Sequence, residues 1–84
     1  MNTYTLNISA KCPHDPKTRD VYQCEITSNE TLLVEAILET ARDLGEEPIY
    51  QEDLTRALAE RLNATVTLEG DHSNVHVVSS AMPK

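Results

Sequence analysis

The chain has 84 residues, of which 14 are acidic and 7 are basic, so its formal charge is −7. A chain of this length builds one hydrophobic core, and we expect a single domain over residues 1–84. Between residues 30 and 60 there are nine acids against two bases, and such a surface repels a phosphate backbone, so we expect no direct binding of nucleic acid.

No apolar run is long enough to cross a membrane, and the N-terminus lacks a basic segment followed by an apolar one. We therefore expect a cytoplasmic protein with no membrane partner. In that reducing compartment Cys12 and Cys24 are expected to be free thiols. The sequence has no phosphate-binding or dinucleotide-binding loop motif, and we expect no cofactor.

Two N-terminal segments, residues 3–10 and 20–28, alternate between apolar and polar positions. This is the period of a strand with one buried face. The residues expected on that face are Tyr4, Leu6, Ile8, Ala10, Tyr22, Cys24 and Ile26. Residues 11–19 contain two prolines and several turn formers, which predicts an antiparallel hairpin with a long loop.

Apolar residues then recur every three or four positions, which predicts two helices. The first is expected to begin after Asn29, a good N-cap, and to stop at Gly45 in the left-handed conformation. The second is expected to begin near Gln51 and to end at Asn63, also in the left-handed conformation.

Alternation returns after Asn63 and predicts two more strands, with a turn at Gly70 and Asp71 and a loose tail over residues 79–84. The fold class is therefore α+β, a four-stranded antiparallel sheet with two helices on one face, in the order β-β-α-α-β-β. A β-grasp-like fold is the alternative, disfavoured because it normally has one helix between its hairpins. The expected core residues are Leu6, Ile8, Ile26, Leu33, Ile37, Leu54, Leu58, Val66 and Val75.

The first hairpin loop is the leading candidate for chemistry. Cys12 ends a strand close to three bases, Lys11, Lys17 and Arg19. Nearby positive charge favours the thiolate, which is the nucleophilic form of cysteine. Asp20 can accept a proton. The alternative is an ordinary polar turn whose cysteine has no special role.

A metal site is not expected. Cys12 and His14 are too close in sequence for the usual ligand spacing of zinc, and the strand geometry predicted for His72 and His76 separates them by about 13 Å. Cys24 is expected to be a small core residue. The segment from Glu69 to Asn74 is a second candidate site, because it gathers an acid, an imidazole, a hydroxyl and an amide in one turn.

The element order, the pair Cys12-Pro13 at the end of the first strand, and Asp20 at the start of the second resemble the tunnelling-fold superfamily. That superfamily includes GTP cyclohydrolase, pterin synthases and the nitrile reductase of queuosine biosynthesis. The resemblance implies that Cys12 is a covalent nucleophile towards a nitrile carbon and that Asp20 handles protons. It also implies that Glu69 and His72 anchor the base of a purine- or pterin-like ligand.

Three functions compete. The first is a self-associating tunnelling-fold-like module with little or no catalysis of its own. The second is an enzyme of that superfamily that acts on a purine- or pterin-like ring through Cys12. The third is an acidic interaction protein, such as a phage-type inhibitor of a nucleic-acid-binding protein. The expected partners are further copies of the chain or a protein with a basic surface.

Overall fold

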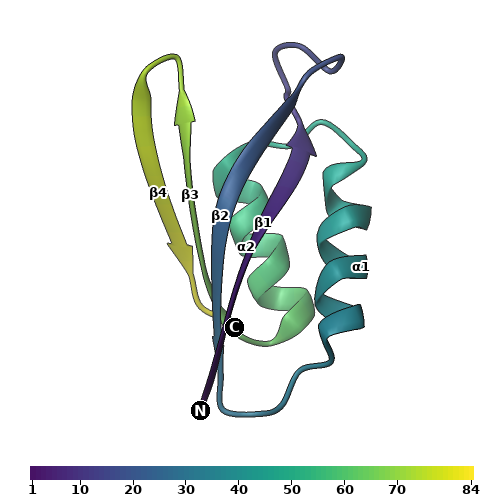
Figure 1. Ribbon diagram of the computed structural model, residues 1–84, viewed down its shortest axis with the longest axis vertical. Helices are drawn as coiled ribbons and strands as arrows, with labels where there is room; N and C mark the ends of the chain where they lie inside the picture. Colours follow the sequence, from purple (N-terminus) through teal and green to yellow (C-terminus); the bar gives the residue numbers. More distant parts are fainter.

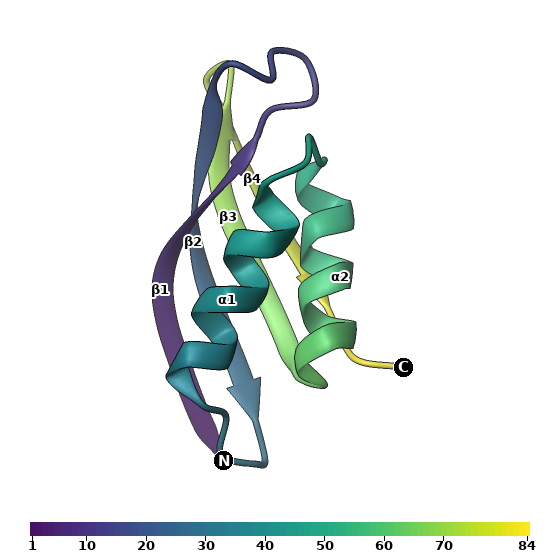
Figure 2. The same ribbon diagram turned by 90° about the vertical axis from the view of Figure 1, so that its right-hand side faces the viewer.

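The computed structural model describes all 84 residues, in the order β1 (Asn2–Lys11), β2 (Arg19–Ser28), α1 (Val34–Gly45), α2 (Gln51–Leu62), β3 (Thr65–His72) and β4 (Val75–Ala81). The strands form one antiparallel sheet in the order β1-β2-β3-β4. Both helices cover the same face of this sheet, and the other face is bare (Figures 1 and 2). The predicted fold class and element order are confirmed. None of the helices is long and apolar enough to span a membrane.

The core lies between the helices and the sheet. Its 14 buried residues are Ile8, Ala10, Tyr22, Cys24, Ile26, Ile37, Ala41, Leu54, Leu58, Ala59, Leu62, Ala64, Val66 and Leu68. Six of the nine expected core residues are among them, and Leu6 packs against the cluster. The prediction was wrong for Leu33 and Val75, whose exposed fractions are 69% and 60%. Leu33 precedes the first turn of α1, and Val75 begins an edge strand beside a turn.

Helix α1 begins at Val34, several residues later than predicted from Asn29. The connection before it is held by side chains of the strands. Ser28 Oγ accepts a hydrogen bond from the amide of Glu30 at 3.0 Å, and Tyr4 Oη accepts one from the amide of Leu32 at 2.9 Å. These bonds stabilise a non-helical connection where the sequence suggested the first helical turn.

Neither glycine has a positive φ, so neither is needed for a left-handed backbone. Both are needed because a side chain at either position would clash with a neighbouring strand. A Cβ atom on Gly45, at the end of α1, would lie 2.4 Å from the carbonyl oxygen of Ser9 in β1. The left-handed stop predicted at Gly45 was therefore wrong. Asn63 does end α2 as predicted, with φ 52° and ψ 52°.

The turn predicted at Gly70 and Asp71 was also wrong, because both residues belong to β3. The chain reverses at Ser73 and Asn74, whose φ angles are 49° and 71°. Two successive positive φ angles are typical of the tight turns that suit the twist of a hairpin. Strand β4 then continues to Ala81, so residues 79–81 are not part of a loose tail.

Candidate functional site

Three segments meet at one end of the molecule: the β1–β2 loop, the start of α2, and the β3–β4 turn (Figures 1 and 2). A hydrogen bond of 3.2 Å from the amide of Ile49 to the carbonyl oxygen of Lys11 ties the α1–α2 connection to the end of β1. Between these segments lies a cavity of about 390 Å³. The polar residues that line it are Cys12, His14, Asp20, Tyr22, Tyr50, Gln51, Glu52, His72 and Ser73.

Three of the four predicted site residues therefore line one cavity. Cys12 is the first residue after β1, and it is half-buried with a free thiol. Its amide donates a hydrogen bond to the carbonyl oxygen of Thr18 at 3.2 Å, which closes the loop. Arg19, one of the three bases expected near the Cys12 thiol, makes its hydrogen bonds elsewhere. The guanidinium of Arg19 donates to Ser9 Oγ at 3.1 Å and to the carbonyl oxygen of Gly45 at 3.3 Å, and it does not line the cavity.

Asp20, Tyr22 and His72 form a cluster on the helix-covered face of the sheet. Tyr22 Oη donates to Asp20 Oδ2 at 3.4 Å, and His72 Nδ1 lies 4.0 Å from the same oxygen. The rings of Tyr22 and His72 are 5.8 Å apart between centroids. Burial, followed by the negative charge of Asp20, raises the pKa of Tyr22 far above its ordinary value. Tyr22 therefore stays protonated and serves as a donor to Asp20.

Gln51, at the first position of α2, is a member of this site that the sequence did not reveal. Its exposed fraction is 3%. Its Nε2 donates to the carbonyl oxygens of Leu68 and Val77, each at 3.0 Å, and its Oε1 lies 2.8 Å from His72 Nε2. The partners lie on two strands far along the chain, so no local pattern in the sequence signals this role.

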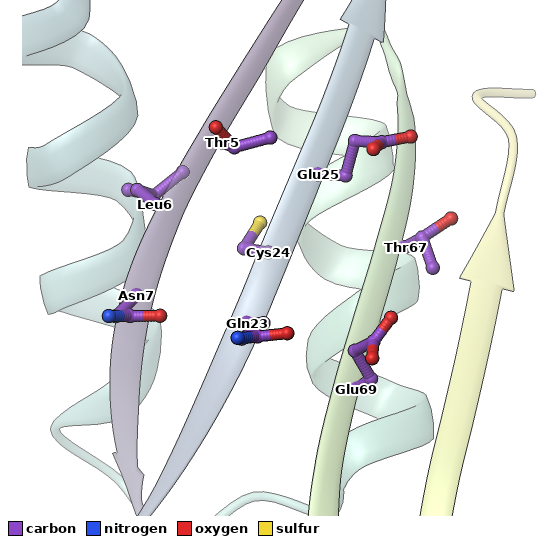
Figure 3. A pocket seen from close by; sticks show the side chains of 8 residues that line it. All are labelled: Thr5, Leu6, Asn7, Gln23, Cys24, Glu25, Thr67 and Glu69. Atoms are coloured by element: carbon purple, nitrogen blue, oxygen red, sulfur yellow. The ribbon is translucent and has the colours of Figure 1, made fainter.

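Glu69, for which the resemblance implied a role in anchoring the ligand, does not line this cavity. It lies on the bare face of the sheet, where it borders a hollow of about 500 Å³ together with Gln23, Glu25 and Thr67 (Figure 3). Successive residues of a strand point to opposite faces, so Glu69 and His72 are separated by the sheet itself. The carboxylates that do line the cavity are Asp20 and Glu52.

The two histidines near the β3–β4 turn also lie on opposite faces. His76 Nδ1 is 2.7 Å from Asp71 Oδ1, and its Nε2 is 3.3 Å from Glu69 Oε1, both on the bare face. His72 faces Gln51 on the other side. No group of three or more His, Cys, Asp or Glu side chains is placed to hold a metal ion.

No family model matches this chain, and no curated protein is similar to it in sequence. A solved structure does share its architecture: the crystal structure of the archaeosine synthase QueF-Like in the apo form. The two chains are 20% identical and superpose with a TM-score of 0.81, over 95% of this chain and 89% of the other. The chain has a tunnelling fold. The resemblance predicted from the sequence is confirmed at the level of the fold.

Proposed function

We propose that this chain is a tunnelling-fold enzyme module that binds a purine- or pterin-like ring in the cavity and attacks it through Cys12. The observation that carries this proposal is the convergence of Cys12, Asp20 and His72 on one cavity from three separate segments. Among the three functions considered from the sequence, the geometry supports the enzyme best. The similarity in fold to an archaeosine synthase favours the same class of activity.

The chemistry that fits these side chains is addition of a thiol to a nitrile. The sulfur of Cys12 bonds to the nitrile carbon while one carbon–nitrogen π bond breaks. The thiol proton passes to the Asp20 and His72 pair, and a proton from that pair goes to the nitrile nitrogen. The product is a thioimidate, with no net change in protons or electrons.

Recognition of the ring falls to residues at the walls of the cavity. His72 also lines the cavity, and in our proposal its part is the proton transfer shared with Asp20. Glu52 replaces Glu69 in our proposal, because it is the carboxylate that α2 brings to the cavity, where it can accept hydrogen bonds from ring N–H groups. The apolar walls are Ile49, Val75 and Val77, which suit the flat faces of a heteroaromatic ring.

The test is formation of a covalent adduct with a purine-like heteroaromatic nitrile. Intact mass spectrometry should show a gain equal to the mass of one nitrile, and peptide mapping should place it on Cys12. Cys12→Ser should abolish the adduct, Asp20→Asn should slow its formation, and Cys24→Ser, the matched control, should leave it unchanged. An adduct on neither cysteine, with a folded protein and a ring shown to bind, would refute the proposed nucleophile.

A second candidate is a self-associating module without catalysis. It is supported by the two edges of the sheet, because β1 and β4 each have one side without a strand partner. Strand β4 also exposes Val78, at 57%. Unpaired edges are sites where another chain can add a strand. Light scattering coupled to size exclusion tests this directly: a ring of several copies fits either tunnelling-fold function, and a lone monomer favours the acidic interaction protein.

A further inference from the structure

The carboxamide of Gln51 has its orientation fixed by two carbonyl groups. Carbonyl oxygens can only accept hydrogen bonds, so the atom of Gln51 that faces Leu68 O and Val77 O must be the NH₂ nitrogen, and both of its hydrogens are engaged. The remaining atom, Oε1, faces His72 Nε2 at 2.8 Å. A flipped amide would set an oxygen against two oxygens in a buried place, which is strongly unfavourable.

It follows that Gln51 can only accept from His72. An imidazole nitrogen beside an obligate acceptor must carry a hydrogen to bond with it. We propose that Gln51 is a positioning residue that keeps a proton on Nε2 of His72, so that the ring exchanges protons only through Nδ1. This inference rests on the proposed function for its catalytic meaning, but its structural content concerns Gln51 and His72 alone.

The free nitrogen then points at the acid of the site. Nδ1 of His72 lies 4.0 Å from Asp20 Oδ2, and Tyr22 Oη donates to that same oxygen. The titratable groups that line the cavity with His72 are Asp20 and Tyr22 from β2, Glu52 from α2, Tyr50 just before α2, and Cys12 and His14 from the loop. With Nε2 committed, Nδ1 is the one ring nitrogen through which a proton can pass between His72 and Asp20. In the proposed reaction the nitrile nitrogen receives its proton by this route, and the thiol proton of Cys12 replaces it.

The test is nitrogen-15 NMR of the histidine side chains in the complete chain. In the wild-type protein, the neutral ring of His72 should have a protonated Nε2 with a visible N–H signal and an unprotonated Nδ1. A proton on Nδ1 instead would overturn the proposal without any variant. His14 and His76 provide reference signals in the same spectrum.

Two variants separate positioning from a structural role. Gln51→Glu keeps an acceptor for His72 but loses both donors to the strands, and Gln51→Met loses all three bonds. Both should unfold more easily, yet only Gln51→Met should let the His72 N–H exchange with water faster, by about tenfold, which is the effect of losing one net hydrogen bond. Thr55→Val, which removes a buried bond of 2.7 Å to the carbonyl oxygen of Gln51, is the control. Its His72 signal should be unchanged.

The outcome of this experiment does not depend on the proposed function, because the experiment uses no substrate. The expected N–H pattern together with no Cys12 adduct would retain the role of Gln51 and remove the nitrile chemistry. An adduct together with equal N–H exchange in Gln51→Glu and Gln51→Met would retain the nucleophile and refute the positioning role.

Discussion

Gly70 in β3 lies against the ring of Tyr22 in β2, so closely that a Cβ atom on Gly70 would be 2.6 Å from Tyr22 Cδ1. Tyr22 is one of the largest fully buried side chains, with an exposed fraction of 1%. Its ring also lines the cavity beside His72. The absence of a side chain at position 70 therefore determines where the ring of the candidate site can lie.

Gly70→Ala should destabilise the fold by about 1–3 kcal/mol, because the added methyl group forces the Tyr22 ring from its place in a packed core. The change is measured as a lower urea midpoint with an unchanged slope. In a Tyr22→Leu background the same substitution should cost clearly less, since the ring that it displaces is gone. An equal cost in both backgrounds would show that the contact with Tyr22 is not the cause.

Leu58→Ala should cost about 2–4 kcal/mol of unfolding free energy. Leu58 has an exposed fraction of 1% and packs between α2 and the sheet, so its removal leaves a cavity. Leu33→Ala is the matched control, because Leu33 is 69% exposed, and its cost should stay below about 0.5 kcal/mol. Similar costs for the two leucines would contradict the arrangement of the helical layer.

Stability should depend on pH through His76. Hydrogen bonds to Asp71 first, and then to Glu69, raise the pKa of His76 above its ordinary value. A raised pKa stabilises the folded state fully below the unfolded value, near 6.5, and the contribution disappears as the pH rises through the folded value. Urea unfolding should therefore show the largest gap between wild type and His76→Gln below about pH 6.5. A gap that widens towards alkaline pH would have the wrong sign.

The two thiols should differ in reactivity. Cys24 is 3% exposed, and burial raises its pKa to about 11, so little thiolate forms there at neutral pH. Cys12 is half-buried and lines a cavity. Alkylation of the folded protein followed by peptide mapping should label Cys12 well before Cys24, and mild denaturant should abolish the difference. Equal, slow labelling of both thiols under native conditions would argue against an accessible nucleophile.

Direct binding of DNA or RNA should not be detectable at physiological salt. The nine acids and two bases between residues 30 and 60 lie largely in the helical layer, where they repel phosphates. Fluorescence anisotropy with a labelled single strand and a labelled duplex measures this. Micromolar binding that weakens as salt is added would contradict the prediction.

The spacing of apolar residues along the sequence predicted most of the fold, because strands and helices bury residues at different spacings. The turn at Ser73 and Asn74 was missed, because the prediction assigned the turn to Gly70, the only glycine nearby. Gly70 is required because the Tyr22 ring packs against it, and no local pattern in the sequence indicates that contact.

The site was predictable to the extent that it depends on strand ends. Cys12 and Asp20 flank one loop, so a hairpin brings both to the same end of the sheet. The alternation of β3 already put Glu69 and His72 on opposite faces, and the misplaced turn concealed this separation. The role of Gln51 in the site could not be predicted, because its side chain bonds to carbonyl groups of two strands that lie much later in the sequence.

The β1–β2 loop that carries Cys12 contributes none of the 14 core side chains. Substitutions at Pro13 and His14, which line the cavity, can therefore change its chemistry without much change in the folding equilibrium. A protein with a small margin of stability can accumulate mutations only where they cost little. In this fold such freedom coincides with the segment that carries the proposed nucleophile, so the lining of the cavity can change while the sheet and its helices stay the same.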